Sequence, residues 1–345
     1  MMTNFASSIP FTAAGALLMT ACATLASEPG TFDRTLAVSG PVRLDVRSDR
    51  GGVIVTAGPA TSMRIHAVIK PLYGKFDLDI AEANIRALEK DPPIEQVGNQ
   101  IRVGYVKDPA LLRGVTIRFE IEAPPATAVR ARTESGGIRL DGINGPIETE
   151  TSSGKTEISN VAGPAKVVGH SGAVIIRDAG NRVTVRNQSG GLDLIRIRGA
   201  LDAATTSGRT EIRDVSGDIR STTESGSILI DDAKAAVFAL NRSGSIDATR
   251  LRGAITAETS SGAIRISQIS PAPIRAFAKS GAIKVELARE SGYQLDARSN
   301  SGRIAGPATG MVDRTGDAHS LQAKLGAGGP LVDLDTHSSR IEIVR

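Results

Sequence analysis

Serine is the residue type in this chain that first suggests catalysis. Ser171 follows a histidine in a Gly-His-Ser-Gly segment, and Ser189 lies in Gln-Ser-Gly-Gly, so either hydroxyl resembles a hydrolase nucleophile. Such a serine needs a base within hydrogen-bonding reach and a third group that orients the base. Neither serine is unique, because a Ser-Gly pair recurs every 18 residues in the middle of the chain.

This repetition favours a structural role for the serines. The series consists of Ser135, Ser153, Ser171, Ser189, Ser207, Ser225, Ser243 and Ser261. We interpret it as a turn ladder, in which each hydroxyl bonds nearby backbone and the serines of adjacent repeats.

The histidines form no pattern that is typical of a metal site. His66, His170, His319 and His337 are isolated from one another and from the single cysteine. Zinc sites use histidine and cysteine at short, regular spacings, and the calcium-binding glycine-aspartate nonapeptides of β-rolls do not occur here. We therefore expect no metal, no cofactor and no enzymatic activity.

Four arginines could form a basic patch if adjacent repeats stack in register: Arg196, Arg198, Arg250 and Arg252. Such a patch would bind an anionic glycan, lipopolysaccharide or lipid headgroups. The alternative is an ordinary mixed-charge face, because Asp178 and Asp214 lie one repeat on either side of Arg196 and alternate with it in sign. A net charge of only +4 and 3% aromatic residues argue against a nucleic-acid partner.

The 18-residue period predicts the fold that positions these groups. Aliphatic residues recur two and four positions after most of the glycines, which is the period of a strand with one buried face. A second glycine, as at Gly145 and Gly163, marks the half-repeat, where we expect it to supply a positive φ. Each repeat then holds two short strands, which stack in parallel about 4.8 Å apart around a narrow core. We predict an all-β fold, a single-stranded parallel β-solenoid of 18-residue coils that resembles a β-helix.

Another column, fifteen residues after each glycine, is mostly threonine and asparagine. Its members are Thr133, Thr151, Gly169, Asn187, Thr205, Thr223, Asn241 and Thr259. We expect an internal ladder of stacked polar side chains at a corner of the coil. The alternative is an outward threonine array of the ice-binding type.

The N-terminal segment is a predicted export signal. No charged residue precedes Glu28, and residues 9–26 are apolar or small. The sequence Leu-Met-Thr-Ala-Cys that ends at Cys22 resembles a bacterial lipobox, so residues 1–22 are interpreted as a signal peptide with lipidation of Cys22. The alternatives are a soluble form cleaved near Ala26 and an uncleaved protein with a free thiol.

The remaining chain divides into two predicted regions. Residues 23–130 form an N-terminal β-rich capping region with a helix near 79–90, which would cover the exposed strand edge of the stack. Residues 131–345 form the solenoid, and the last stretch, from Leu331 onward, is expected to be a closing coil at its far end.

Three features resemble a bacterial family of β-strand-repeat proteins called "putative adhesin", whose function is unknown. They are Arg-Phe-Glu-Ile-Glu-Ala-Pro-Pro at 118–125, the repeated Thr-x-Ser-Gly-x-Ile-x-Ile units, and Val-Asp-Leu-Asp-Thr-His-Ser-Ser-Arg-Ile-Glu-Ile at 332–343. The resemblance spans about residues 35–345. It implies an exported or envelope protein and brings no established catalytic residues.

These observations predict a noncatalytic cell-envelope protein, lipid-anchored, that acts as an adhesin-like or scaffold protein for other envelope components. We expect an outer-membrane lipoprotein that faces the periplasm or the cell surface, with a soluble secreted or periplasmic form as the alternative. The alternative function is a polysaccharide-binding or polysaccharide-degrading β-helix protein. Against it, the repeats keep a constant length without inserted loops, and the chain has no Trp and three Tyr.

Overall fold

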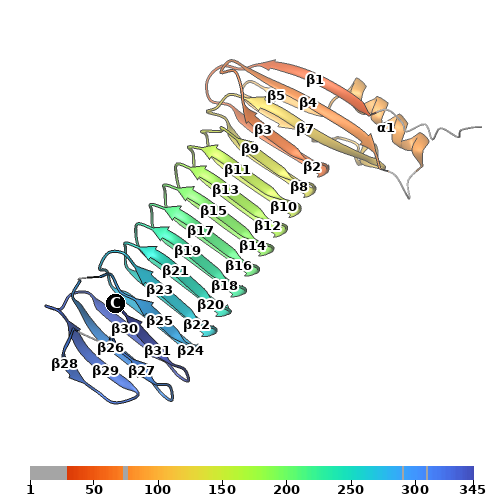
Figure 1. Ribbon diagram of the computed structural model, residues 1–345. Coiled ribbons are helices and arrows are strands. Elements are labelled where there is room, and N and C mark those ends of the chain that lie inside the picture. Colours follow the sequence, from red (N-terminus) through yellow and green to blue (C-terminus); the bar gives the residue numbers. More distant parts are fainter. Residues whose placement is uncertain (1–28, 73–76, 290, 308–309) are drawn as a thin grey trace, which may run out of the picture.

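The computed structural model describes residues 29–72, 77–289, 291–307 and 310–345. Figure 1 shows a rod of stacked strands with a helix at one end and a hairpin at the other. Two sheets form the rod and enclose one continuous aliphatic core. This arrangement confirms the predicted parallel β-solenoid.

The two sheets contain nearly all of the regular structure. In spatial order, the first sheet consists of β1 (Gly30–Ala37), β4 (Ser62–Pro71), β7 (Val115–Ala123), β3 (Val53–Ala57), β9 (Ile138–Asp141), β11 (Thr156–Val161), β13 (Val174–Ala179), β15 (Leu192–Ile197), β17 (Thr210–Val215), β19 (Ile228–Ala233), β21 (Ile246–Leu251), β23 (Ile264–Gln268), β25 (Ile283–Glu286), β31 (Ile341–Val344) and β27 (Ile304–Ala305). The second sheet consists of β28 (Met311–Thr315), β29 (Ser320–Leu325), β26 (Tyr293–Ser299), β30 (Leu331–Thr336), β24 (Ile274–Ser280), β22 (Ile255–Ser261), β20 (Val237–Ser243), β18 (Ile219–Ser225), β16 (Leu201–Ser207), β14 (Val183–Ser189), β12 (Ala165–Ser171), β10 (Ile147–Ser153), β8 (Ala128–Ser135), β2 (Arg43–Arg50), β6 (Gln100–Val103) and β5 (Ile94–Val97).

Each repeat contributes one strand to each sheet, and the strands pair in parallel with a shift of one repeat. Ile212 lies between Leu194 and Ile230 in the first sheet, and all three side chains are buried. The described chain contains thirteen such rungs, so the stack is about 60 Å long at the usual spacing between strands. The core between the two sheets is a thin layer of aliphatic side chains, so few aromatic side chains are needed to fill it.

The glycine of each Ser-Gly pair allows the backbone to approach the next coil. Gly208 has a φ of +136°, and a Cβ on it would lie 2.3 Å from the carbonyl oxygen of Gly190. Its amide donates a hydrogen bond of 3.0 Å to the carbonyl of Ser225. A side chain would therefore strain the turn and separate two rungs.

We expect Gly208→Ala to lower the free energy of unfolding by roughly 2–4 kcal/mol, because the methyl group meets backbone that cannot move aside. Gly191→Ala is the matched control, since its φ lies outside the left-handed region and its nearest neighbour would be 3.7 Å away. Urea unfolding followed by circular dichroism measures both. Equal stabilities for the two variants would contradict this account of the turn.

The half-repeat glycines have a different role from the one predicted. Gly163 has no positive φ, but a Cβ on it would lie 2.3 Å from the carbonyl oxygen of Gly145 in the adjacent rung. Close approach between backbones therefore requires glycine at this position. The left-handed residues of this corner come three positions earlier and are Asn160, Asp178, Arg196, Asp214, Asp232 and Arg250.

One rung is longer than the others, and it changes which residue is buried. Ile269 lies one 18-residue period after the buried Leu251 but is 47% exposed, because the pairing between β21 and β23 shifts and places Gln268 opposite Leu251. The buried Gln268 amide donates to the carbonyl of Ala272 and accepts a hydrogen bond from the Tyr293 hydroxyl. The extra residue accounts for the drift of the Ser-Gly series beyond Ser261.

At the N-terminal end, the order of rungs differs from the order in the chain. The rung made by β2 and β3 lies between β8/β9 on one side and β6/β7 on the other. The helix α1 (Leu78–Lys90) begins after the capping residue Asp77 and packs Ile85 and Leu88 against the extension formed by β1, β4 and β7. A short 3-10 helix spans Pro109–Leu112. Part of the predicted capping region, residues 43–57, is thus itself a rung of the stack.

The C-terminal end repeats this arrangement and corrects the prediction of an outermost closing coil. The strands β30 and β31 do form a coil, but it lies between β24/β25 and β26/β27. The outer rung comes from residues 293–305, and β29 and β28 add antiparallel strands beyond it. Gly292 and Gly329 allow the outgoing and returning chain segments to cross, since a Cβ on Gly329 would lie 2.4 Å from the Gly292 carbonyl oxygen.

Candidate functional site

The eight serines of the repeat align in the stack but do not form the expected hydroxyl ladder. Ser153 lies opposite Ser135 on one side and Ser171 on the other. All eight side chains are exposed, and none of their hydroxyls makes a hydrogen bond within the part of the chain that is described. The ladder consists of backbone hydrogen bonds instead, as between the Gly172 amide and the Ser189 carbonyl at 3.0 Å. Among the residues that the structure describes, no base is hydrogen-bonded to any of these serines.

The threonine and asparagine column is internal, as predicted. The Asn187 amide donates to the carbonyl of Gly172 at 3.0 Å, and the Asn241 amide donates to that of Gly226 at 2.8 Å. Thr151 and Thr259 make the same contact at 3.4 and 3.3 Å. Because these groups are buried and bonded to glycine carbonyls, they support the Ser-Gly corner and offer no outward array to a ligand.

The four arginines of the predicted basic patch are largely paired with carboxylates. Arg196 binds Asp178 through two hydrogen bonds of 2.6 and 2.7 Å, and this contact lowers the pKa of the Asp178 carboxyl. Arg250 and Arg252 pair with Asp231 and Asp232.

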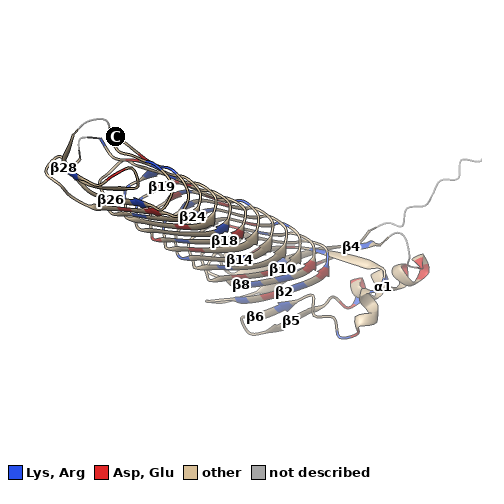
Figure 2. Cartoon of the chain, turned by 90° about the horizontal axis from the view of Figure 1, so that it is seen from below, with Lys and Arg blue, Asp and Glu red and all other residues tan. Residues whose placement is uncertain are grey.

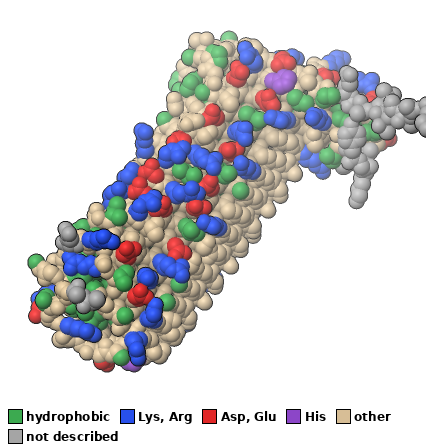
Figure 3. Space-filling view, in the orientation of Figure 1, with side chains coloured by type: hydrophobic (Ala, Val, Ile, Leu, Met, Phe, Trp, Pro, Cys, Tyr) green, Lys and Arg blue, Asp and Glu red, His purple; other side chains and the backbone are tan. Residues whose placement is uncertain are grey.

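The four arginines also do not form one cluster. Arg250 lies three rungs from Arg196, about 14 Å along the stack. Arg198 and Arg196 line the same hollow as Asp214 and Lys234. Figure 3 shows the resulting surface, on which acidic and basic side chains are interspersed along the rod.

Two of the histidines, His66 and His319, lie at opposite ends of the rod. His66 contacts Asp33 at 3.0 Å at one end of the rod, and His319 contacts the carbonyl of Gly302 at 2.8 Å at the other. Within the described ranges, no cluster of three or more histidine, cysteine or acidic residues could hold a metal ion. Cys22, the predicted lipidation site, lies outside the described residues.

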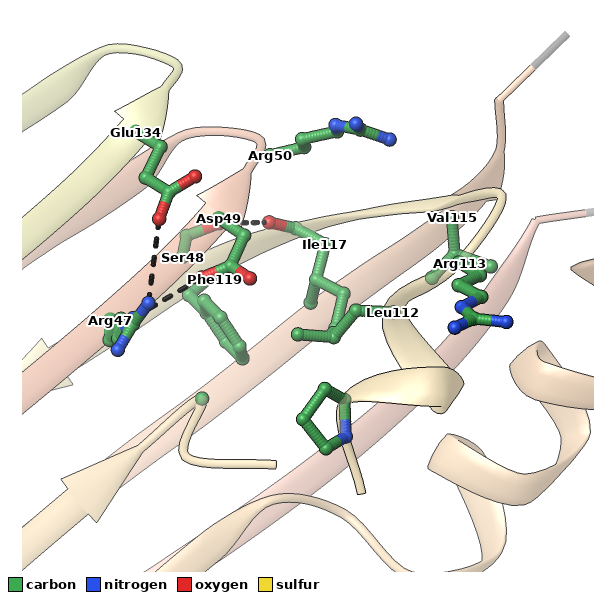
Figure 4. A pocket seen from close by; sticks show the side chains of 12 residues that line it. Arg47, Ser48, Asp49, Arg50, Leu112, Arg113, Val115, Ile117, Phe119 and Glu134 are labelled. Atoms are coloured by element: carbon green, nitrogen blue, oxygen red, sulfur yellow. Dashed lines mark hydrogen bonds and ion pairs between the residues drawn. The ribbon is translucent and has the colours of Figure 1, made fainter. Parts of the chain in front are cut away.

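A hollow occurs where the N-terminal cap meets the first rungs (Figure 4). It has a volume of about 190 Å³, and its apolar floor is formed by Leu112, Val115, Ile117 and Phe119. Its charged rim comes from β2, the end of β8 and the segment after the 3-10 helix. The charged rim residues are Arg47, Asp49, Arg50, Arg113 and Glu134.

The rim and the floor of this hollow are engaged in contacts that join the cap to the rod. Arg47 binds Asp49 at 3.2 Å and Glu134 at 3.4 Å. The buried Ser48 hydroxyl donates to the carbonyl of Ile117 at 3.0 Å. In Figure 4 the side chains of Arg50 and Arg113 extend away from Phe119. The hollow can accept a small apolar group, but its one hydroxyl, that of Ser48, is already bonded to the Ile117 carbonyl.

Beside this hollow lies a polar cluster that sequence reasoning missed. The Tyr105 hydroxyl contacts Arg132, which also binds Asp45 at 3.2 Å, and the Arg102 guanidinium stacks 4.0 Å above the Tyr105 ring. Burial raises the pKa of Tyr105, and its hydrogen bond with Asp45 adds to this effect. The only sequence signal was the scarcity of tyrosine, of which the chain has three. The cluster joins the loop after β6 to the rungs of β2 and β8.

Among the described residues, no helix is long and apolar enough to span a membrane. No curated protein shows a significant match to this chain.

Several solved structures resemble the chain at low identity. A "putative cell adhesion protein" from Clostridium sporogenes ATCC 15579 is 9% identical over 92% of this chain and 99% of that chain, with a TM-score of 0.23. A "putative lipid binding protein" from Parabacteroides distasonis ATCC 8503 and a "putative adhesin" from Bacteroides fragilis NCTC 9343 are each 13% identical, over 74% of this chain and 96% of theirs, with TM-scores of 0.34.

A family match covers most of the solenoid. Residues 174–343, from β13 to β31, match the model of the family described as Toastrack DUF4097. The match includes the Ser-Gly rungs from Ser189 to Ser261 and the inserted C-terminal rung, and it confirms the family resemblance seen in the sequence. Over these residues the chain is therefore similar to the Toastrack DUF4097 family.

Proposed function

We propose that this chain is a noncatalytic protein of the bacterial cell envelope, attached to a membrane by a lipid on Cys22, in which the solenoid is a stiff spacer. The observation that carries the proposal is the position of the two ends. The first described strand, β1, lies at the α1 end of the rod, and the β28–β29 hairpin lies at the opposite end (Figure 1). A chain anchored at its N-terminus would hold the C-terminal cap about 60 Å from the anchored end.

The regular rungs support a spacer role. Ion pairs link side chains on neighbouring rungs, as between Lys166 and Glu148 at 3.0 Å and between Arg265 and Asp247 at 2.9 Å. Each exposed pair contributes little by itself, but backbone hydrogen bonds join every pair of neighbouring strands in both sheets. Because repeats contact only their nearest neighbours and are joined by hydrogen bonds along the whole stack, we expect a rod that resists bending.

In this proposal the exported protein is an adhesin-like or scaffold component of the outer membrane, facing either the periplasm or the cell surface. A soluble secreted form is the alternative if Cys22 is not modified.

We expect the wild-type protein to incorporate radioactive palmitate and to sediment with membranes, whereas Cys22→Ala should lose the label and appear in the soluble fraction. Cys22 is the only cysteine of the chain, so the label can be assigned without mapping. Ser27→Ala is the control and should behave like wild type. An unlabelled wild-type protein with the same distribution as Cys22→Ala would exclude the anchor and support the secreted form.

A further inference from the structure

The described surface contains a trough on the outer face of the second sheet, near the N-terminal end of the rod. It crosses the starts of β2, β8, β10, β12 and β14 and has a volume of about 610 Å³. Figure 2 labels β2, β8, β10 and β14 along this side of the rod. Its floor is formed by Ala128, Pro146 and Pro164. These short, rigid side chains leave the trough open, whereas long side chains cover the neighbouring columns.

Two arginines without partners lie at the ends of this floor. Arg43 pairs in register with Ala128 at one end of the floor. At the other end, Ala165 pairs with Val183, so the residues just before them, Pro164 and Arg182, lie in the same column. Arg43 and Arg182 are four rungs apart, roughly 19 Å along the stack. Among the described residues, neither guanidinium has a hydrogen bond or an ion pair.

The flank of the trough adds further positive charge. Arg130 and Lys166 contact the two oxygens of Glu148 at 3.6 and 3.0 Å, so one carboxylate is shared between two cations. The hydrogen bond from Lys166 holds the pKa of Glu148 below its usual value, and this carboxyl stays ionised in neutral solution. The second acid of the trough, Asp45, is bound by Arg132. The trough therefore keeps a net positive charge, in contrast to Arg196, Arg250 and Arg252, which are paired with carboxylates.

We propose that this trough binds an extended acidic polysaccharide, with one anionic group at Arg43 and another at Arg182. The proline rings and the alanine methyl group form a narrow apolar strip suited to the C–H faces of sugar rings. Glu148 and the Thr184 hydroxyl offer hydrogen bonds to sugar hydroxyls. The described lining contains no aromatic side chain on which nucleic-acid bases could stack. The inference deepens the proposed function by naming a partner class, and it rests on that function for the supply of such a polymer in the envelope.

The test is direct binding of the purified full chain, in mild detergent, to polygalacturonate and to dextran sulfate, measured by calorimetry. We expect Arg43→Gln with Arg182→Gln to weaken binding about tenfold or more, since two charge-assisted contacts are lost. The control is Arg198→Gln with Lys279→Gln, which removes the same charge from exposed positions elsewhere and should change affinity less than about twofold. Equal losses in both variants would show a nonspecific charge effect and overturn the proposal.

A second pair of variants tests the floor without removing a cation. Pro164→Glu places a carboxylate in the trough and should abolish binding, whereas Ala162→Glu, exposed in the same turn but lining a different hollow, should not. Circular dichroism verifies that both variants are folded.

Competing ligands complete the test. Stronger binding of poly-glutamate or single-stranded DNA than of the polysaccharides would overturn the proposal in favour of those partners, as would the absence of binding to any acidic polysaccharide. Cys22→Ala should bind polysaccharide like wild type, so failure of the trough and failure of the anchor are distinguishable.

Discussion

Replacement of Ile212 by aspartate is expected to unfold the middle of the solenoid. The Ile212 side chain is fully buried between Leu194 and Ile230, in a core only one layer thick. A carboxylate there would have no cationic partner and no access to water, so we expect a loss of roughly 4 kcal/mol or more in the free energy of unfolding. That loss is comparable with the whole stability of many domains. Because each rung supports its two neighbours, the damage should extend beyond one repeat.

Thermal unfolding and far-UV circular dichroism measure this effect. Arg213→Ala is the matched control, since Arg213 is the next residue, is exposed and contacts Glu211 on the surface at 2.6 Å. We expect its stability to lie within about 1 kcal/mol of wild type, as is usual for exposed ion pairs. If Ile212→Asp kept the wild-type spectrum and melting transition, the assignment of this column to the core would be wrong.

Removal of residues 331–345 is expected to detach the C-terminal cap from the rod. The deleted β30 pairs with β24 and β26, and β31 pairs with β25 and β27, so one rung is lost from the interior of the stack. The outer rung and the hairpin of β28 and β29 then lose their connection to β24 and β25. We expect residues 293–325 to lose protection from hydrogen exchange, while the regular rungs up to Ser261 retain theirs.

Two single substitutions provide the controls for this deletion. Leu334→Ser changes a fully buried residue of the inserted rung and should weaken the cap, whereas Leu331→Ser, at a position 47% exposed, should have little effect. The inserted position of the rung would be contradicted if residues 293–325 stayed protected in the truncated protein. In that case the outer rung would have to dock directly onto β24 and β25.

The repeat itself made the core predictable. Strands of similar repeats pair in register when their aliphatic positions recur with the same period. Ile212 and Ile230 are one period apart in the sequence and lie opposite each other in the sheet. The internal threonine and asparagine column was predictable for the same reason. The left-handed conformation at the half-repeat corner was not predicted. The sequence did carry a signal for it, since Asn160, Asp178 and Asp214 belong to the residue types that tolerate a positive φ.

The candidate sites were less predictable than the core. The corner arginines were expected to act as a basic patch, but register places Asp178 beside Arg196, and the turn geometry brings Asp231 and Asp232 to Arg250 and Arg252. The trough was not foreseen, since Arg43 and Arg182 are 139 positions apart in the chain and come to lie in one column only because β2 joins the stack.

The sequence by itself determined the coil length, the parallel stacking and the residues that face the core, because these follow from a local pattern that each repeat carries. Only the tertiary structure decided the order of the rungs at both ends, and with it the trough and the inserted C-terminal coil. The physical reason is that every rung presents the same backbone edge and the same aliphatic faces. The sequence pattern of a rung therefore predicts that the rung stacks but does not predict which rung lies next to it. That order depends on contacts between distant segments, such as the one between Gly292 and Gly329.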